Sequence, residues 1–413
     1  MSSPALQKAA GPGLTEFVLL VSAVMMTVAL AIDSMLPALP AIGSALGVAD
    51  ENQRQFVISA FLAGFGISQL VSGTLSDRFG RRGLLLIAVF GYTAMSLAAA
   101  LAQDFEQLLA ARALQGMMAA SAQIVIRSVV RDRFAGREMA QVMSLASTIF
   151  MFAPILAPAM GQLVLELGPW RWIFGILSIF GLLIWFWALL RLPETLAQEM
   201  RIQIRLATIV ESARIVATDR MSLGYSIALA IISCSLYGFL LSVQQIFEHV
   251  LHAPERLPLG FAVMASGMAA ASLGNAAIVK RFGMRLIGHC ALIYFALVAA
   301  VHLGVALSGH ETLVSFILLQ TAMMLGFSFT VGNFSAMAME NMGGVAGMAN
   351  SLQGSLSNVA GIVFGTLIGQ SFDGTTVPLY TGYFVSAVLA LAVVFVTEGG
   401  RFFTARHAPI KEA

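Results

Sequence analysis

Residues 73–82 read Gly-Thr-Leu-Ser-Asp-Arg-Phe-Gly-Arg-Arg, and this short charged stretch separates two long apolar runs. A second Arg-Phe-Gly occurs in residues 280–285, which read Lys-Arg-Phe-Gly-Met-Arg. Arg281 follows Arg78 by 203 residues, about half the length of the chain. An internal repeat of this kind predicts two halves of related structure, as in membrane proteins built from two parallel repeats.

The composition excludes a soluble protein. The 413 residues are 58% hydrophobic and 11% charged, with a mean hydropathy of +0.86. Because soluble domains carry about 25% charged residues, soluble enzymes, nucleic-acid binders and secreted disulfide scaffolds are excluded. A helix that spans the bilayer core needs about 20 apolar residues. Runs of sufficient length fall at 16–38, 53–75, 83–102, 106–128, 139–165, 172–192, 222–247, 258–279, 285–308, 312–335, 346–370 and 378–397.

Twelve such runs predict an all-α integral membrane protein with two pseudo-symmetric bundles of six helices. Most connections between the runs are short. The connection at 193–221 is longer and holds eight charged residues. We therefore expect an N-terminal six-helix bundle at 1–192, a cytoplasmic linker at 193–221 and a C-terminal six-helix bundle at 222–413.

Lysine and arginine are distributed unevenly about the predicted spans. If the N-terminus is cytoplasmic, nineteen of the twenty-three Lys and Arg residues lie in cytoplasmic segments. Arg54, Arg171 and Arg256 lie in outer loops, and Arg112 lies within a span. This asymmetry follows the positive-inside rule, so both termini are expected in the cytoplasm. It also accounts for the basic pI of about 8.7 without a nucleic-acid partner.

Three further stretches have an informative spacing. Residues 33–40 read Asp-Ser-Met-Leu-Pro-Ala-Leu-Pro, residues 112–116 read Arg-Ala-Leu-Gln-Gly, and residues 153–161 read Ala-Pro-Ile-Leu-Ala-Pro-Ala-Met-Gly. Arg131-Asp132 and the stretch 168–171, Gly-Pro-Trp-Arg, follow at the ends of other runs. Each combines charged, proline or glycine residues with an otherwise apolar context, where such residues are costly.

Together with residues 73–82, these stretches resemble motifs A, B and C and the first-helix signature of the major facilitator superfamily. The combination is similar to the Bcr/CflA subfamily of drug:proton antiporters. The resemblance covers the whole chain and is densest over residues 30–195. It implies the twelve-helix fold of that superfamily and transport rather than enzymatic catalysis. It further implies the inner membrane of a bacterium as the location.

Asp33 and Arg112 are the acid and the base that lie deep within the predicted spans. Charged side chains are costly there, so a functional role is expected. At 1.5 Å per residue, Asp33 lies about 15 Å and Arg112 about 10 Å from the outer face. The similar heights predict that the two side chains pair, with Asp33 as the proton carrier and Arg112 tuning it or binding substrate. The alternatives are a fixed buried ion pair and a structural anchor.

Two groups of positions are expected to line a substrate cavity. Polar groups in lipid need partners or water, so a polar stripe on a span should face a cavity or another helix. Interhelical packing is the alternative for both groups. The positions are Gln115, Ala119 and Gln123 on the fourth run and Ser233, Tyr237 and Gln244 on the seventh, with Asn333, Asn350, Gln353 and Asn358 as weaker candidates.

The resemblance assigns a gate to the inner ends of the helices. It implies that Asp77 caps the N-terminal end of the eleventh helix and that Arg81 pairs with Asp132. Lys280 stands in the second half where Asp77 stands in the first, so we expect an asymmetric inner gate. Part of this charge also follows from the positive-inside rule alone. The expected gate positions are Gly73, Asp77, Arg78, Gly80, Arg81, Arg82 and Asp132.

Pro154, Pro158 and Gly161 in the fifth run predict a bend and close helix packing. Their resemblance to motif C implies an outer seal against leakage, and an ordinary proline kink is the alternative. His289 and His302 lie in the ninth run and are expected to be packed side chains rather than a proton relay.

Two functions remain open at this point. The first is a proton-coupled exporter of lipophilic drugs, and the resemblance suggests phenicol, bicyclomycin or sulfonamide-like compounds. The second is proton-driven uptake of a small polar metabolite, which would be expected to place several opposed charges in the cavity. The expected partners are a small-molecule substrate, protons and the lipid bilayer. We expect no nucleic acid, no metal and no cofactor other than protons as the coupling ion, and a monomer.

Overall fold

A computed structural model describes residues 12–196, 199 and 206–403. These residues form helices joined by short connections, and no β-strand occurs among them. Within a bilayer every backbone polar group must be satisfied inside the segment, which a helix achieves. The apolar runs of the sequence therefore appear as helices.

The helices are long and apolar enough to cross a membrane. Among the described residues, eleven segments meet this condition by length and composition, and a twelfth, Asn52–Phe79, is bent by 51° near residue 70. Many large apolar side chains lie on the surface, including Leu101 at 68%, Leu190 at 77% and Val396 at 68% exposure. Such surface is unfavourable in water and is matched by lipid tails, so the predicted multi-pass membrane protein is confirmed.

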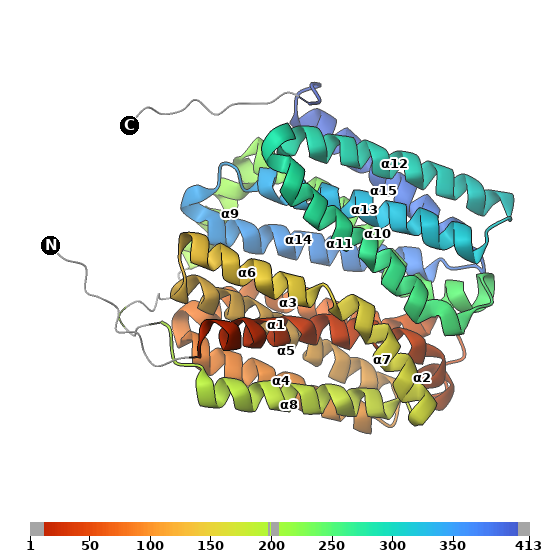
Figure 1. Ribbon diagram of the computed structural model, residues 1–413, viewed down its shortest axis with the longest axis horizontal. Helices are drawn as coiled ribbons and strands as arrows, with labels where there is room; N and C mark the ends of the chain where they lie inside the picture. The colour runs from red at the N-terminus through yellow and green to blue at the C-terminus, as the bar shows by residue number, and fades with distance from the viewer. Residues whose placement is uncertain (1–11, 197–198, 200–205, 404–413) are drawn as a thin grey trace. The chain divides into compact units, whose positions relative to one another are not determined.

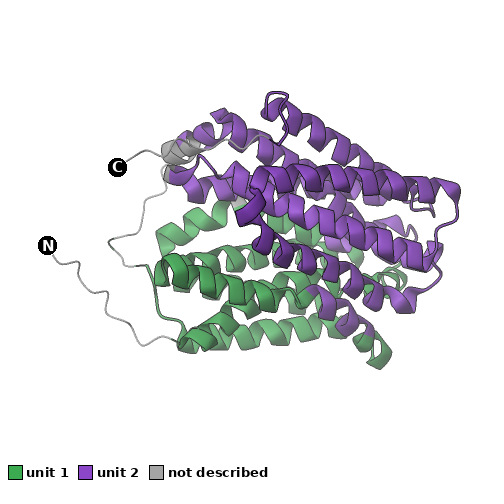
Figure 2. Ribbon diagram, turned by 45° about the horizontal axis from the view of Figure 1, so that its top comes forward, with its two compact units in different colours: residues 1–47, 60–153, 163–204 green, residues 48–59, 154–162, 205–413 purple. Residues whose placement is uncertain are grey.

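The described residues fall into two compact units, which Figure 2 colours green and purple. Unit 1 comprises residues 1–47, 60–153 and 163–204. Its helices are α1 (Leu14–Asp33), η1 (Leu36–Ala38), α2 (Leu39–Ala45), most of α3 (Phe56–Phe79), α4 (Arg81–Leu101), α5 (Phe105–Arg133), α6 (Gly136–Phe150), the end of α7 (Ala153–Leu167) and α8 (Arg171–Arg191). Figure 1 labels the α-helices.

The core of unit 1 is formed where α1, α4, α5, α6 and α8 face one another. Phe17, Val24, Leu85, Val125 and Ile126 are among its fully or almost fully buried side chains. The burial of each large apolar side chain in such a core contributes about 1.5–3 kcal/mol in water. In lipid, close packing rather than water exclusion holds the helices together.

Unit 2 comprises residues 48–59, 154–162 and 205–413. Within it α10 packs against α13, α14 and α15, and α12 packs against α13 and α15. The helices of unit 2 are η2 (Asn52–Gln55), α9 (Leu206–Thr218), α10 (Arg220–Gln245), the π-helix η4 (Ile246–Val250), η5 (Pro254–Arg256), α11 (Leu257–Phe282), α12 (Met284–Ser308), α13 (Leu313–Ala338), η6 (Gly343–Val345), α14 (Ala346–Gln370) and α15 (Val377–Thr397).

The change of unit at residue 205 falls inside the linker that the sequence predicts at 193–221. Part of that linker is itself helical, as α9, and α9 packs on α10 and α14. Two short segments from the first half of the sequence, 48–59 and 154–162, are grouped with the second half. Their contacts place the start of α3 and the proline-containing part of α7 in unit 2.

Prolines set several helix boundaries near the predicted motifs. The fifth run is interrupted between α6 and α7, and Pro154 occupies the first turn of α7. Pro158 lies inside α7, where it has no N–H for the helix ladder. In the first run Pro37 follows the end of α1 and starts the short helix η1. Pro158 and Gly161 are buried, and the bend that the sequence predicts in the fifth run stays a prediction.

Candidate functional site

Asp33 is the last residue of α1, at the point where the helix gives way to η1. The residue is 5% exposed, and the neighbouring Ser34 hydroxyl donates to the Leu30 carbonyl at 2.6 Å. Within the part of the chain that the structure describes, the Asp33 carboxylate forms no ion pair. A buried carboxylate without a counter-charge is unfavourable when ionised, so this position suits a group that gains and loses a proton.

Arg112 is fully buried on α5 and is held by several neutral groups. Its Nη1 donates to Gln115 Oε1 at 2.7 Å, and Gln115 Nε2 donates in turn to Ser96 Oγ at 2.7 Å. The guanidinium also lies 4.6 Å from the ring centre of Phe61 and 5.7 Å from that of Phe174. Cation–π contacts and hydrogen bonds of this kind stabilise a buried guanidinium in one orientation.

The direct pairing of Asp33 with Arg112 that the sequence predicts is not found. In the described part of unit 1 no ion pair joins the two side chains, and the guanidinium is directed toward Gln115 instead. The prediction was based on depth along two helices. Depth fixes a height in the bilayer and leaves open the direction in which each side chain points.

Close packing of α3 on α5 places the aromatic ring against the guanidinium. A Cβ atom on Gly116 would lie 1.9 Å from the Phe61 carbonyl oxygen, and one on Gly64 would lie 1.8 Å from the Ala113 oxygen. Neither position can carry a side chain without separating the helices. The glycine of the 112–116 motif is thus needed so that α3 can bring Phe61 onto Arg112.

The other predicted cavity positions are divided between the two units. Ala119 is fully buried and Gln123 is 8% exposed, both on α5. On α10 the Ser233 hydroxyl donates to the carbonyl of Leu229, within its own helix. These contacts leave the choice between cavity lining and helix packing open for all three positions.

Tyr237 and Gln244 on α10 have polar partners within unit 2. The Tyr237 hydroxyl donates to Asn358 Oδ1 on α14, which the sequence had indicated as a weaker candidate. The ring of Tyr237 packs where Gly361 and Gly365 leave room on α14. Gln244 donates to Glu248, one turn further along, in η4. Tyr237 and Asn358 are thus brought together, whereas Gln244 belongs to a separate local contact.

The gate positions at the α3–α4 turn form a compact charged cluster in unit 1. Arg81 is 4% exposed, and its Nε donates to Asp132 Oδ2 at 2.9 Å. Its Nη1 lies 2.6 Å from Asp77 Oδ1 and donates to Ser76 Oγ at 2.6 Å. The predicted pair of Arg81 with Asp132 is therefore confirmed. The contact of Asp77 with the eleventh helix stays a prediction.

Gly80 and Glu194 define the N-terminal end of α4. Gly80 adopts φ 97°, a backbone conformation that side-chain-bearing residues rarely adopt. Glu194 accepts hydrogen bonds from the backbone N–H groups of Arg81 at 2.9 Å and Arg82 at 3.2 Å. An acidic side chain is favourable at the positive N-terminal end of a helix. The sequence had placed Glu194 in the linker and had given it no role.

The remaining gate positions lie around this cluster. The Arg82 side chain donates to the Leu189 carbonyl at 2.8 Å, and the exposed Arg78 lies 5.2 Å from the Phe79 ring centre. Gly73 lies in α3, one turn before Asp77. These positions are more exposed than Arg81, and Arg78 and Arg82 contribute positive charge at the α3–α4 turn.

Unit 2 contains its own ionic cluster at the corresponding turn. Arg285 donates to Glu340 Oε2 at 2.8 Å and to Glu398 Oε1 at 3.1 Å. The Tyr225 hydroxyl also donates to Glu398 Oε1, at 2.6 Å, and lies 2.9 Å from His289 Nε2. Lys280 does replace Asp77, but the acids come from the end of α13 and the residue after α15 instead. The two clusters therefore differ in the origin of their acids, and one acid of the second cluster, Glu398, is fully buried.

A group of amides anchors the start of α3 within unit 2. Gln55 Nε2 donates to Gln245 Oε1 and to the Gly369 carbonyl, the latter at 3.0 Å. Asn52 Nδ2 donates to the carbonyls of Gln370 and Phe372, both at 3.1 Å. These residues carry no charge and lie near the ends of spans, so their role could not be predicted from the sequence.

The helical bundle, the buried ionisable groups and the repeated turn clusters define a multi-pass membrane transporter rather than an enzyme. Residues 21–366 match the Major Facilitator Superfamily. The chain is 31% identical to the Bacillus subtilis (strain 168) MFS-type transporter YdgK, over 88% of this chain and 90% of that protein. The chain therefore belongs to the major facilitator superfamily.

Other relatives share the same family. A bicyclomycin resistance protein homolog of Haemophilus influenzae is 27% identical over 92% of this chain and 96% of that protein. The multidrug resistance protein MdtL of a Shewanella species is 33% identical over 40% of this chain and 41% of that protein.

Solved structures share the fold. The xylose transporter XylE from E. coli, in a partially occluded inward open conformation, has a TM-score of 0.71 at 11% identity, covering 96% of this chain and 99% of that one. The human organic anion transporter MFSD10 has a TM-score of 0.66 at 17% identity, covering 93% of this chain and 100% of that one.

Proposed function

We propose that this protein is a proton-coupled antiporter that exports lipophilic drugs by alternating access, with Asp33 as the proton carrier. The observation that carries the proposal is the Asp33 carboxyl group, which is 5% exposed and forms no ion pair among the described residues. A group in this situation can exist as a neutral acid while the site is closed and can ionise when water or a cationic substrate reaches it.

Arg112 acts in this proposal as a fixed positive charge. It is buried, it lies in the same unit as Asp33, and an arginine does not release its proton under physiological conditions. A fixed cation in a medium of low dielectric constant favours the ionised form of an acid over a longer range than a surface charge does. Arg112 therefore helps Asp33 to release its proton without forming a lasting ion pair with it.

Relatives support the class of substrate. Two of the curated proteins similar to this chain are named for resistance to bicyclomycin and to multiple drugs. Within unit 2 the half-buried Tyr237 offers an aromatic surface, which suits an amphipathic ligand. Compounds of the bicyclomycin, phenicol or sulfonamide type are the proposed cargo.

The distribution of Lys and Arg supports an orientation. With nineteen of twenty-three in the segments on one side, both termini and the α3–α4 turn lie in the cytoplasm of the proposed bacterial inner membrane. The Arg81 cluster is then a cytoplasmic gate, and residues 309–312 and 373–376 face outward. Transport in this scheme needs no cofactor, and a single chain suffices.

Transport in proteoliposomes tests the proposal. Proteoliposomes that contain the purified protein are given bicyclomycin, a phenicol or a sulfonamide on one side of the membrane. An imposed pH gradient then drives the drug against its concentration gradient. The Asp33→Asn variant keeps the shape but cannot exchange a proton, so accumulation should fall to the background. One charge moved through 100 mV supplies about 2.3 kcal/mol, or about a 50-fold gradient.

Glu166→Gln, at an exposed acid in α7, is the matched control and should transport as the wild type does. Uptake of polar metabolites with the pH gradient, and none of the drugs, would replace the export proposal with an importer. Full accumulation by Asp33→Asn would remove Asp33 from the role of carrier.

A further inference from the structure

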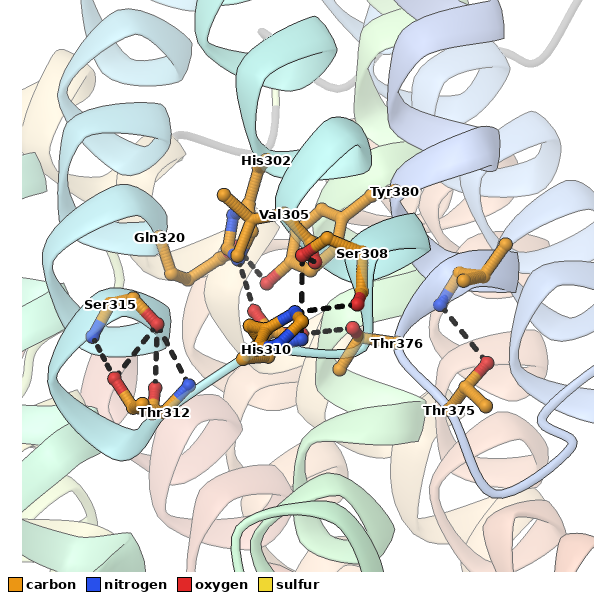
Figure 3. Close-up of polar contacts among 12 residues, drawn as sticks. His302, Val305, Ser308, His310, Thr312, Ser315, Gln320, Thr375, Thr376 and Tyr380 are labelled. Carbon is orange, nitrogen blue, oxygen red and sulfur yellow. Dashed lines mark hydrogen bonds and ion pairs between the residues drawn. The ribbon is translucent and has the colours of Figure 1, made fainter.

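His302 and Glu311 form a buried pair near the end of α12 in unit 2. His302 Nε2 lies 2.6 Å from Glu311 Oε1, and the two side chains are 0% and 4% exposed. Glu311 belongs to the connection between α12 and α13, and its other oxygen, Oε2, accepts a hydrogen bond from the Thr376 hydroxyl at the start of α15. Figure 3 shows His302, Thr376 and Tyr380 gathered from α12 and α15.

Both oxygens of the Glu311 carboxyl have a polar partner, His302 Nε2 at Oε1 and the Thr376 hydroxyl at Oε2. With an ionised Glu311 and a neutral imidazole, the pair carries a net charge of −1 between two buried side chains. One additional proton on the imidazole makes the pair neutral. Because an uncompensated buried charge is far more costly than a neutral pair, the pair favours the state that has taken up the proton.

The surroundings supply no other counter-charge. Among the described residues the ion pair of Glu311 with His302 is the only one that Glu311 makes. The connection also contributes His310, which is exposed and contacts the Ser308 carbonyl. The helix η4, whose Phe247 packs on Phe316 of α13, carries two titratable side chains. These are Glu248, bonded to Gln244, and His249, paired with Glu51.

The aromatic residues around the pair can accommodate a charged imidazole. The ring of His302 stacks on Tyr380 with centroids 3.5 Å apart and an interplanar angle of 25°. An imidazolium over an aromatic face is attracted by the ring electrons. Tyr380 donates to Gln320 at 3.2 Å, and Gln320 donates to the Tyr383 hydroxyl at 3.0 Å. No carboxylate other than Glu311 touches the imidazole in the described part of unit 2.

His302 Nδ1 is buried and has no hydrogen-bond partner among the described residues. A packed structural histidine would be expected to satisfy both nitrogens. We propose that the His302–Glu311 pair is a second proton-binding site, separate from Asp33, that ties the α12–α13 connection to the start of α15. The proton adds to the imidazole nitrogen that lacks one, and no other bond forms or breaks.

This site lies on the outer face if the orientation of the proposed function holds. It would then respond to the pH outside the cell, because the connection 309–312 would reach that solution. When the pair has taken up its proton, it holds Glu311 between α12 and α15. Loss of the proton leaves a buried negative charge that weakens this tie.

The protonation state can be measured directly. The chain has six histidines, so ¹⁵N-histidine labelling and solid-state NMR in lipid give six imidazole signals. The signal that His302→Gln removes belongs to His302, and His310→Gln identifies an exposed control in the same connection. We expect the His302 signal in the wild type to show two protonated nitrogens at a pH at which the exposed His310 signal also does so.

Glu311→Gln keeps the shape of the site and removes the counter-charge, so the His302 signal should become that of a neutral imidazole at the same pH. Glu311→Gln also tests the proposal if His302→Gln does not fold. A neutral His302 in the wild type at a pH where His310 is charged would overturn the proposal. So would a His302 signal that Glu311→Gln leaves unchanged.

A transport assay separates this inference from the proposed function. Glu311→Gln should flatten the dependence of drug transport on the pH of the outer solution, while Asp33→Asn should abolish transport. If Asp33→Asn transports normally but the NMR result is as expected, the proposed function fails and the proton site stands.

Discussion

The buried acids of the two units differ in the partners that hold them. In unit 2, Glu398 is held by Arg285 and Tyr225, and Glu311 is held by His302 and Thr376. In unit 1, Asp33 is buried without an ion pair among the described residues. A carboxylate with fixed partners keeps its charge and its position. A carboxyl group without them can change both, so we expect Asp33 in unit 1 to change its charge during transport and Glu398 in unit 2 to keep its position.

The turn clusters differ in the same direction. The partners of Arg81 in unit 1 are partly open to solvent, since the side chains of Asp132 and Asp77 are 17% and 38% exposed. The side chain of Glu398, the partner of Arg285 in unit 2, is 0% exposed. Water can compensate an acid that loses its arginine in unit 1. It cannot do so at Glu398, so the same substitution should have unequal effects.

Arg285→Ala should give the largest loss of stability. It leaves Glu398 buried and charged without a cation, and removal of one partner of a buried ion pair costs about 3–5 kcal/mol. The thermal unfolding of purified protein in detergent measures the effect. Arg285→Ala with Glu398→Gln should recover much of the loss. A single variant as stable as the wild type would remove the contrast between the units.

Arg81→Ala should have a smaller effect on stability and a clear effect on transport. Hydrogen bonds to charged groups contribute about 1.5–3 kcal/mol, and Asp77 and Asp132 gain water in return. We expect a lower thermal midpoint, by less than for Arg285→Ala, and reduced transport with drug binding retained. Binding by isothermal calorimetry and transport in proteoliposomes check the two parts. Unchanged transport, or a loss of drug binding that accounts for the loss of transport, would contradict a gate at this cluster.

Arg112→Lys should have the smallest effect of the three. The lysine keeps the charge but cannot maintain the contacts with Gln115 and with the Phe61 ring as a planar guanidinium does. We expect transport reduced about ten-fold, with Arg112→Ala more strongly impaired. If Lys and Ala behave alike, the contribution of Arg112 is its geometry and not its charge.

Much of the fold follows from the sequence because span length and hydropathy are local properties. The Arg81–Asp132 pair came from the resemblance of residues 73–82 to a known motif. The contact of Arg112 with Gln115 follows from their spacing of three residues on one helix face. Under the repeat offset of 203 residues, the position equivalent to Glu194 is next to Glu398. This correspondence could have located the second cluster from the sequence.

Other parts of the site depend on packing that the sequence does not express. Glu311 stands in a short polar connection, where an acid is ordinarily solvated. It becomes buried because α15 begins beside it and Thr376 closes over its carboxyl group. His302 was expected to be a packed side chain, and it is buried but paired with Glu311. The direction of the Asp33 and Arg112 side chains depends on how α1, α3 and α5 cross, which depth along a helix does not determine.

The number of protons released when drug binds tests the role of Asp33 most directly. Unbuffered purified protein is mixed with the transported drug, and a pH indicator records the protons set free. The account predicts release by the wild type and by Glu166→Gln, and no release by Asp33→Asn at saturating drug. Undiminished release from Asp33→Asn that still binds the drug would show that another group carries the proton.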